Sequence, residues 1–342
     1  MQSQSGTPSS SNASDGNTRN IAIGPLIFDC AICAVVAFLF CAIPELAIQP
    51  YRRGFFCDDD SIRYPYKGNT IPTFALVFIL IAVIIITVWR FVAGVETFRV
   101  IRLSKNDISV YRLKGRDVHR LFVRFCAYAA HCVLGTLVSV IVCQITKYAV
   151  GRLRPHFISV CDPDINMTAC AISHEYITDY ICNGKSESRI RDARLSFFSG
   201  HATTAMCVAV FCVLYLQARL PRRMYGISLL PLFQTILIGG ALLIGYSRIS
   251  DNMHHWSDVL VGFLIGATVG FLSAVYFAQL FKRRNAIYKS EEQLPLVDTE
   301  LGITNNARRT SAMLSYSTAN GGTVMATTCV PLTSERSAQL SL

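Results

Sequence analysis

Long apolar runs separated by polar segments dominate the chain. The runs lie near Ile21–Ile43, Ile71–Trp89, Phe125–Ile145, Ala202–Leu216, Ile227–Tyr246 and Val259–Phe281. Most of them approach the roughly 20 residues that an α-helix needs to cross a bilayer. The fourth run is short unless its helix already begins in the preceding segment SGHATT. Because a soluble fold rarely needs six such stretches, the pattern predicts an all-α integral membrane protein with a six-transmembrane-helix bundle.

Composition points the same way and sets the domain limits. Of the 342 residues, 52% are hydrophobic and 16% are charged, whereas charged residues make up about 25% of a typical soluble protein. The first segment is rich in Ser, Asn and Gly and lacks the basic start and early apolar core of a cleavable signal. The Ser/Thr-rich C-terminal segment has no sustained periodicity. We expect one membrane domain, residues 21–282, between disordered tails at 1–20 and 283–342.

Basic residues are distributed unevenly among the loops. Residues 90–120 carry eight Lys or Arg and three Asp or Glu, and residues 217–226 carry three Arg and no acid. Residues 44–70, expected on the opposite side of the membrane, carry four of each sign. The positive-inside rule therefore places the basic loops and both tails in the cytoplasm. The net charge of +10 reflects topology and a binding site, and we expect no nucleic-acid partner.

Four of the thirteen cysteines fall in segments that this topology places outside: Cys57, Cys161, Cys170 and Cys182. Four cysteines allow three pairings, and the sequence does not choose among them. Zinc binding is the competing interpretation, but the spacings do not match the close pairs of zinc sites. We expect one or two disulfides. The same outer loop contains the sequon Asn166-Met-Thr168, where we expect glycosylation.

Three polar clusters interrupt the apolar pattern. They are KYAVGRLRP at 147–155, SFFSGHAT at 196–203 and SRISDNMHHWSD at 247–258. The first follows the third predicted helix, the second precedes the fourth, and the third precedes the sixth. In a six-helix chain these positions share one face of the membrane, the extracellular or luminal one. The topology therefore permits one site built from all three clusters.

The clusters contain the residue types that a phosphate site requires. Their cations are Lys147, Arg154 and Arg248. Ser199 and Gly200 stand at an expected helix start, where free N–H groups and a closely approaching backbone bind anions. The groups able to handle protons are His201, His254 and Asp258. The sequence thus predicts a site for a tetrahedral oxyanion with acid–base groups beside it.

The pair His254 and Asp258 suggests nucleophilic catalysis. If the sixth helix begins near His254, Asp258 lies at i+4 on the same face and can hold one imidazole nitrogen. A histidine oriented in this way can act as a nucleophile. Phosphate-monoester hydrolysis needs accelerations of up to ~10²¹, whereas a positioned general acid supplies only ~10²–10⁴. A covalent mechanism with positioned cations is therefore favoured.

Several of these residues also have structural interpretations. Arg248 and Lys147 could extend toward the membrane interface as anchors. For His255 and the intramembrane His131 we favour structural roles. Three glycines repeat at four-residue intervals in the last run, at 262, 266 and 270. That pattern indicates close helix packing, either within the bundle or between subunits. Self-association as a homo-oligomer therefore stays open.

The sequence resembles the type-2 phosphatidic acid phosphatases, and within them the lipid phosphate phosphatases. KYAVGRLRP fits K-x6-R-P, FSGH fits the Ser-Gly-His motif, and SRISDNMHHWSD fits S-R-x5-H-x3-D. The segments RGFFCDDDSIRYPYKGNTI and GRLRPHFISVC also resemble that group, so the likeness covers roughly residues 21–282. Phe198 departs from the family, many members of which have proline before Ser-Gly-His. An aromatic residue is expected to be tolerated there.

The resemblance implies a role for each residue. His254 would attack phosphorus, Asp258 would orient it, and His201 would protonate the leaving alkoxide. The phosphoryl oxygens would be held by Lys147, Arg154, Ser199, Gly200 and Arg248. No metal or other cofactor is implied. The substrates would be phosphatidate, lysophosphatidate, sphingosine 1-phosphate or ceramide 1-phosphate, and the plasma membrane or an endomembrane would be the location.

Other functions fit part of the pattern. A non-catalytic lipid-phosphate-binding or adhesion protein would use the same cations, but it would not need the pair of histidines. A transporter is disfavoured because no inverted repeat or pair of broken helices is evident. A phosphatase for soluble phosphoesters remains open within the enzyme class. In the C-terminal tail, RRTS at 308–311 and the final Leu-Ser-Leu are short motifs on which no conclusion rests.

Overall fold

Each of the six apolar runs forms a helical segment in the computed structural model, which describes residues 18–89, 93–94, 110–219 and 228–281. The segments are α1 (Ile23–Ala37) and α2 (Ile43–Ala47) joined by a π-helical turn (Phe38–Ala42), α3 (Thr73–Ile84) continued by a π-helical turn (Ile85–Trp89), α5 (Arg120–Val150), α9 (Gly200–Arg219), α10 (Leu229–Ser250), and α11 (Trp256–Leu272) continued by a π-helical turn (Ser273–Phe277). Within the described residues, five segments are long and apolar enough to cross a membrane, and Thr73–Trp89 is a shorter apolar helix. The fourth helix begins in the polar SGHATT segment, as its length required.

The expected tails lie mostly outside the described residues. The exception corrects the N-terminal boundary, because Thr18–Asn20 form strand β1 rather than belonging to a disordered tail. This strand pairs in parallel with β3 (Val110–Leu113), and β3 pairs in antiparallel fashion with β4 (Arg116–Val118). These three residues form a strand because they pair with β3, although their side chains show no pattern that predicts a strand.

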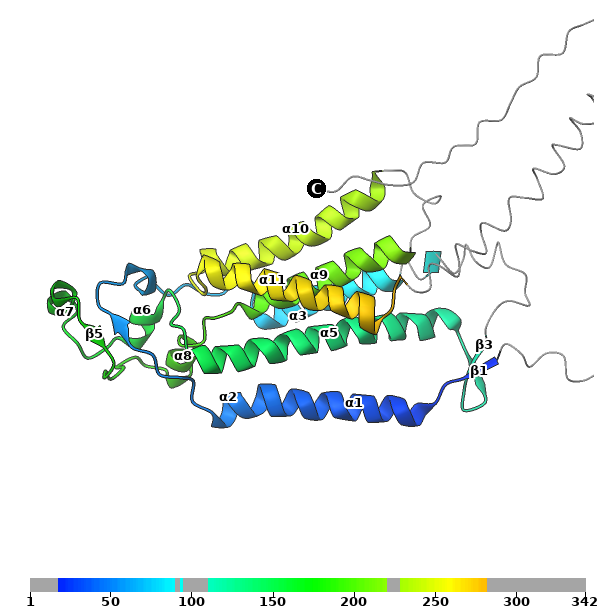
Figure 1. Ribbon diagram of the computed structural model, residues 1–342, viewed down its shortest axis with the longest axis horizontal. Coiled ribbons are helices and arrows are strands. Elements are labelled where there is room, and N and C mark those ends of the chain that lie inside the picture. The colour runs from blue at the N-terminus through cyan, green and yellow to red at the C-terminus, as the bar shows by residue number, and fades with distance from the viewer. Residues whose placement is uncertain (1–17, 90–92, 95–109, 220–227, 282–342) are drawn as a thin grey trace, which may run out of the picture. The chain divides into compact units, whose positions relative to one another are not determined.

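Helix α9 is the centre of the bundle and contacts α11, α10, α5 and α3 (Figure 1). Its closest neighbour is α11, and glycines on α11 make this approach possible. A Cβ atom at Gly266 would lie 2.3 Å from the Thr203 carbonyl oxygen, and one at Gly270 would lie 2.5 Å from that of Cys207. The glycine repeat therefore serves helix packing within the bundle, where side chains would hold the backbones apart.

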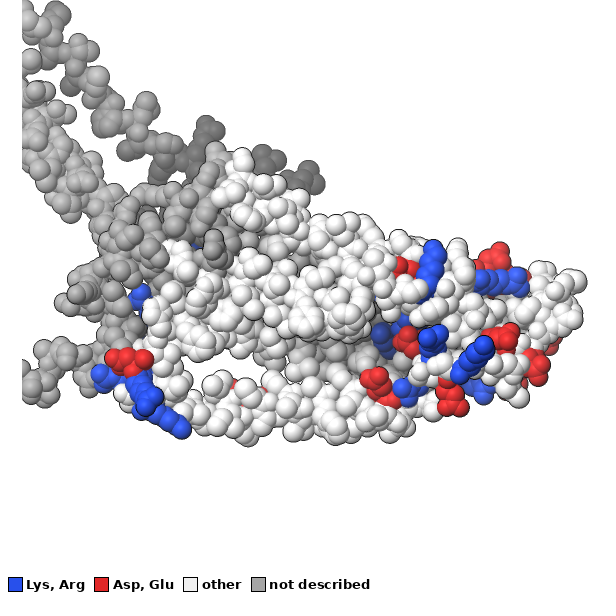
Figure 2. Space-filling view, turned by 180° about the vertical axis from the view of Figure 1, so that it is seen from behind, with Lys and Arg blue, Asp and Glu red and all other residues white. Residues whose placement is uncertain are grey.

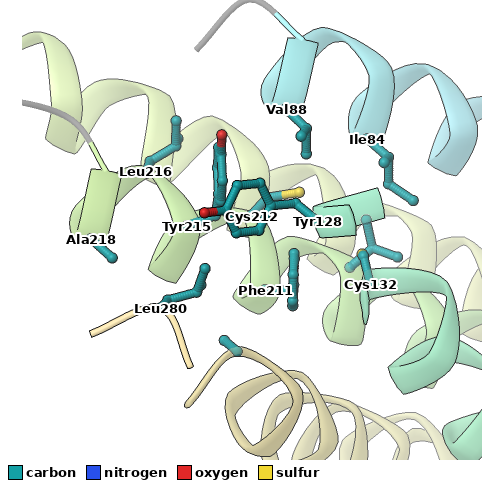
Figure 3. Packing of buried hydrophobic residues seen from close by; sticks show 12 residues of the cluster. Ile84, Val88, Tyr128, Cys132, Phe211, Cys212, Tyr215, Leu216, Ala218 and Leu280 are labelled. Carbon is teal, nitrogen blue, oxygen red and sulfur yellow. The ribbon is translucent and has the colours of Figure 1, made fainter. Parts of the chain in front are cut away.

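A hydrophobic core fills the half of the bundle farther along α9 from the polar clusters (Figure 3). It is formed by α3, α5, α9 and the chain after α11, and its largest members include Tyr128, Phe211, Tyr215 and Leu280. The Tyr128 and Tyr215 rings lie 5.1 Å apart, within the range of favourable aromatic pairing. This core fixes the four segments against one another at the end opposite the polar clusters.

The other end of the bundle carries a small subdomain with its own core. Its elements are β2 (Phe55–Phe56), a 3₁₀ turn (Asp60–Ile62), α6 (Phe157–Cys161), α7 (Met167–Ser173), β5 (Tyr176–Ile177) and α8 (Glu187–Asp192). The strands β2 and β5 pair in antiparallel fashion. Figure 2 shows charged side chains gathered at this end, a smaller group at the opposite end, and a largely uncharged band between them. Such a band is what helices facing lipid present.

Two disulfides tie this subdomain together. Cys57 pairs with Cys170, and Cys161 pairs with Cys182. The expectation of one or two disulfides among these four cysteines is therefore confirmed, and the pairing that the sequence left open is resolved. The first bridge joins the loop after α2 to the loop after α5, so the two long loops form one unit.

Candidate active site

The three polar clusters lie at the same end of the bundle and are connected directly. The Ser199 N–H donates to the Asp258 carbonyl oxygen at 3.1 Å, which links the second cluster to the third. The first cluster is close to the second, because a Cβ atom at Gly200 would lie 3.9 Å from the Lys147 Nζ. Lys147 is in the last turn of α5, and its ammonium group makes no hydrogen bond or ion pair with the described part of the chain. Its ammonium group is therefore available to a ligand.

His254 is buried in the short connection between α10 and α11. Its Nδ1 lies 2.7 Å from the carbonyl oxygen of Ser196. Because a carbonyl oxygen can only accept, Nδ1–H is the donor, and the lone pair of the neutral ring is on Nε2. Burial, reinforced by the positive charges of Arg154 and Lys147, lowers the pKa of His254 to about 3. The ring is consequently neutral at pH 7.

His254 and Asp258 lie close together, but the hydrogen bond of the imidazole is to another group. Helix α11 begins at Trp256, so His254 precedes the helix and the two residues are not one helical turn apart. The Asp258 Oδ2 lies 3.8 Å from the His254 Nδ1, beyond hydrogen-bond distance. The two side chains are at ion-pair distance, while the hydrogen bond of Nδ1 is to the Ser196 carbonyl. That Asp258 orients the imidazole stays a prediction.

Asp258 instead organises the start of α11 and the residues around it. Its Oδ2 accepts from the Ser196 Oγ at 2.5 Å and from the His255 N–H at 3.1 Å. Its Oδ1 accepts from the Arg152 Nη1 at 2.5 Å. Asp258 is completely buried, so these partners compensate its loss of hydration. Ser196 links the carboxylate to His254, because its hydroxyl donates to Asp258 and its carbonyl accepts from His254.

Ser196 and Arg152 were not singled out from the sequence. Both belong to the polar clusters, since Arg152 lies within KYAVGRLRP and Ser196 opens SFFSGHAT. The presence of a third cation in the first cluster was a usable signal for Arg152. No local pattern indicates that the backbone carbonyl of Ser196 is what His254 contacts.

Arg154 is buried and only partly neutralised. Its Nη2 donates to the Asp192 Oδ1 at 2.7 Å, and its Nη1 lies 3.5 Å from the Met253 sulfur. Its buried Nε–H has no partner among the described residues. Met253 is the neighbour of His254, so the guanidinium lies beside the imidazole. A buried N–H without a partner is costly unless a ligand accepts from it.

Arg248 is fully buried near the end of α10. Its Nη2 donates to the Asp251 Oδ2 at 2.8 Å, and its Nη1 donates to the Asn69 Oδ1 at 3.1 Å. The Ser247 Oγ accepts from both its Nε and its Nη2. An arginine held by this many partners is not a free interfacial anchor.

His201 is in the first turn of α9 and is partly buried. Its Nε2–H donates to the Ile71 carbonyl oxygen at 3.2 Å. The backbone N–H groups of Gly200 and His201 have no partner among the described residues, whereas that of Ser199 is already used. The Ser199 hydroxyl is fully buried and accepts from the Ala202 N–H at 3.5 Å. Two free helix N-terminal amides remain for an anion.

Asn166 lies apart from these clusters, exposed at the N-terminus of α7. Its Oδ1 accepts from the N–H groups of Thr168 and Ala169, both at 3.2 Å. The amide nitrogen is therefore on the solvent side of a local cap. Within the described residues, no three His, Cys, Asp or Glu side chains are grouped closely enough to hold a metal ion.

Comparison with known proteins adds an independent finding. The sequence profile of the PAP2 superfamily matches residues 128–282. Phospholipid phosphatase 2 from Bos taurus is 39% identical over 265 residues, which cover 77% of this chain and 86% of the relative. Phospholipid phosphatase homolog 1.2 homolog from Caenorhabditis elegans is 36% identical and shares 81% of this chain and 78% of its own. Phospholipid phosphatase 1 from Mus musculus is 36% identical over 77% of this chain and 88% of its own. No solved structure matches the chain.

Proposed function

Because the chain belongs to the PAP2 superfamily and is a membrane-integral lipid phosphate phosphatase, we propose that it hydrolyses lipid phosphomonoesters by way of a phosphohistidine. The substrates would be phosphatidate, lysophosphatidate, sphingosine 1-phosphate and ceramide 1-phosphate. The observation that carries this proposal is the 2.7 Å contact between the His254 Nδ1 and the Ser196 carbonyl. It leaves the lone pair of a buried, neutral imidazole on Nε2, which is the form that a nucleophile requires.

In the first step the His254 Nε2 forms a bond to phosphorus, and the bond from phosphorus to the lipid oxygen breaks. His201, protonated on both ring nitrogens in the substrate complex, gives its Nε2 proton to the departing alkoxide and becomes neutral. In the free protein the His201 Nε2–H donates to the Ile71 carbonyl at 3.2 Å, so this hydrogen bond must exchange for one to the substrate. In the second step water attacks phosphorus, the N–P bond breaks, and His201 takes a proton from the water.

The transferring phosphoryl group would be held by the cations and amides of the three clusters. Lys147 and the Nε–H of Arg154 have no partner in the described structure, and both lie close enough to His254 to affect its pKa. The free N–H groups of Gly200 and His201 add two neutral donors. Fixed donors of this kind stabilise charge that develops in the transition state. Every step is thereby assigned to groups of this chain.

The proposal places the active site on the extracellular or luminal side and both tails in the cytoplasm. The basic loops support this orientation through the positive-inside rule. Glycosylation of the exposed Asn166 tests it, because only the outer side carries the modifying enzymes. Expression with and without Asn166→Gln should give a mobility difference that glycosidase removes. A tail epitope that antibody reaches on intact cells would contradict the orientation.

The central experiment measures phosphate release by purified protein in detergent with EDTA. A lipid phosphate and a soluble sugar phosphate are compared, and turnover of the lipid phosphate is expected to be much faster. His254→Ala should abolish both hydrolysis and a base-stable, acid-labile label trapped by rapid quench on native protein. His131→Ala is the matched control, because it removes an imidazole from α5 away from the three clusters and should keep activity.

The same assay separates the two histidines. His201→Ala should lose most activity on a lipid phosphate but retain more on an activated aryl phosphate, whose leaving group needs no proton. Arg154→Lys and Arg248→Lys should lower turnover severely, because an ammonium group cannot reproduce the planar, fixed array of donors of a guanidinium. Substantial turnover by His254→Ala, or a label on another residue, would show that the nucleophile is assigned wrongly.

A further inference from the structure

A short stretch of the first outer loop, residues 64–71, crosses all three polar clusters, and we call it the strap. It contacts the first cluster where the Tyr64 N–H donates to the Pro155 carbonyl at 2.9 Å. It contacts the second where the Ile71 carbonyl accepts from His201. Four of its residues contact the third cluster: Pro65, Lys67, Asn69 and Thr70. No other described loop segment touches a residue of each cluster in so short a length.

The contacts of Asn69 and Thr70 converge on Arg248. Asn69 accepts directly from the Arg248 Nη1 at 3.1 Å. Thr70 acts through Asp251, whose two carboxylate oxygens accept from the Thr70 N–H at 2.8 Å and from the Thr70 Oγ–H at 2.6 Å. The same Asp251 carboxylate accepts from the Arg248 Nη2 at 2.8 Å. The strap therefore holds the guanidinium at both of its terminal nitrogens.

These contacts decide how Arg248 can be used. A guanidinium has five N–H donors in one plane. Ser247 accepts from Nε and Nη2, Asp251 accepts from Nη2, and Asn69 accepts from Nη1. One N–H, on Nη1, is left over. With the other four occupied, the plane cannot rotate without breaking several hydrogen bonds in a buried place, so the free donor has a fixed direction.

Buried charge makes this arrangement costly to disturb. Arg248 is 1% exposed and Asp251 is 5% exposed, so neither can exchange its partners for water. Asp251 accepts three hydrogen bonds, two of which come from Thr70. Removing the Thr70 hydroxyl would leave Asp251 short of one donor, and the carboxylate would then move relative to the guanidinium.

We propose that Asn69 and Thr70 are positioning residues of the phosphatase: they set the orientation of Arg248 so that its free Nη1 donor meets the transferring phosphoryl group. The inference rests on the proposed function, since it takes Arg248 as a phosphate-binding residue. Neither residue touches the phosphate itself. Their effect should appear in turnover and in the affinity for a transition-state mimic, because a misdirected donor is lost most where charge develops.

The test compares substitutions that remove and restore one hydroxyl. Thr70→Val keeps the shape and the backbone N–H but removes the Oγ donor, and Thr70→Ser retains that donor. We expect Thr70→Val to lower kcat about tenfold, with KM changed less, which is the loss expected of one hydrogen bond to a charged group. Orthovanadate should inhibit this variant about tenfold more weakly. Thr70→Ser should restore both values to within about twofold.

Thr235→Val is the matched control. Thr235 is exposed on α10, the helix that carries Arg248, and its hydroxyl donates to the Pro231 carbonyl at 2.9 Å. This variant loses the same chemical group, a threonine hydroxyl, from the helix that carries Arg248, but it should keep wild-type kcat and vanadate inhibition. If Thr70→Val does not fold, as judged by its thermal midpoint in detergent, Asn69→Ala provides the second route to Arg248. It should show the same reduction in kcat and weaker vanadate inhibition.

A double-mutant comparison separates failure of this inference from failure of the proposed function. If Thr70 acts through Arg248, Thr70→Val should have little further effect on the residual activity of Arg248→Lys. An Arg248→Ala variant with wild-type turnover would remove Arg248 from the proposed site altogether. An inactive Arg248→Ala variant beside folded Thr70→Val and Asn69→Ala variants with normal kcat and vanadate inhibition would overturn the positioning role alone.

Discussion

Helices α1 and α9 are both apolar, but they bury very different parts of their surfaces. No residue of α1 is buried in the structure, although α1 belongs to the most hydrophobic of the candidate spans. Most residues of α9 are buried, although its span has the lowest mean hydropathy of the five. In a water-soluble protein, the more hydrophobic of two helices would be expected to be the more buried one. A helix that faces lipid needs apolar side chains all around, whereas a helix inside the bundle can use small and polar ones.

The two helices also differ in what holds them. Helix α9 is in contact with four other helices, and α11 approaches so closely that glycines are required. Helix α1 runs alongside α5 (Figure 1), and its segment contacts α5 mainly through the π-helical turn Phe38–Ala42. At the end of the bundle that carries the polar clusters, the Tyr51 N–H donates to the Tyr148 carbonyl at 3.1 Å. The helix with the lowest mean hydropathy, α9, is therefore the structural centre of this protein. The same helix begins at the candidate active site.

The largest expected effect comes from closing the gap between α9 and α11. Gly266→Leu should prevent folding, because its Cβ atom would lie 2.3 Å from the Thr203 carbonyl oxygen, which cannot rotate away. Ordinary overpacking costs about 1–3 kcal/mol, and a collision between two helix backbones should cost more. Gly240→Leu on α10 is the control, since nothing lies within 4 Å of a Cβ atom there.

Size-exclusion chromatography in detergent, followed by a thermal midpoint, distinguishes these two glycine variants. We expect a monodisperse peak for Gly240→Leu and aggregation for Gly266→Leu. A folded and active Gly266→Leu protein would mean that α9 and α11 do not pack as described.

A smaller effect is expected from removing one aromatic ring from each helix. Phe211 of α9 is 0% exposed, and Phe28 of α1 is 64% exposed. Phe211→Ala should lower the free energy of unfolding by about 3–5 kcal/mol, as is usual when a buried aromatic ring is deleted. Phe28→Ala should change it little in detergent, because the ring contacts detergent or lipid in either state. Equal losses in the two variants would contradict the contrast between the helices.

The third comparison lowers the pH, and for each pH unit it predicts the smallest change in stability. The pKa of His254 is lowered to about 3 by its burial beside Arg154 and Lys147, whereas an exposed histidine titrates near 6.5. The unfolded chain therefore binds a proton more readily than the folded one between these values. Stability is fully present above pH 6.5 and falls as the pH is lowered toward 3, by up to about 1.4 kcal/mol per pH unit.

The thermal midpoint of wild type and of His254→Ala, measured from pH 7.5 to pH 4.5, checks this expectation. The wild-type midpoint should fall more steeply, because the variant lacks the buried imidazole. Phe28→Ala should follow the wild-type curve, since Phe28 is on α1, away from His254. Parallel curves for wild type and His254→Ala would mean that His254 does not resist protonation.

Much of the architecture could be predicted from the sequence because it depends on local patterns. Apolar runs located all six helical segments, and the glycine repeat on α11 identified a close helix contact. The polar clusters also lie at one end of the bundle, as alternating helix directions require. Cysteine chemistry indicated disulfides, but only the folded chain selects Cys57 with Cys170 among three pairings.

The missed features depend on residues far apart in the chain. The strap contacts Asp251 from a distance of 181 residues in the sequence, and no periodicity reports such a pairing. The contact of His254 with a backbone carbonyl was also hidden, because any residue supplies a carbonyl. Helix α11 begins at Trp256, two residues after the expected start near His254, so the i+4 spacing is not one helical turn. The His254 Nδ1 therefore lies closer to the Ser196 carbonyl than to Asp258.

The Cys57–Cys170 disulfide makes part of the chain a closed ring. The bridge spans 113 residues and encloses α3 and α5, together with the segment between Trp89 and Val110 that connects them. A single backbone cut within that segment would open the ring without dividing the molecule. The portion from α1 to α3 and the portion from α5 to α11 would migrate as one species until a reductant was added. The sulfur–sulfur bond would thus keep the two portions joined even when the backbone between Trp89 and Val110 is cut.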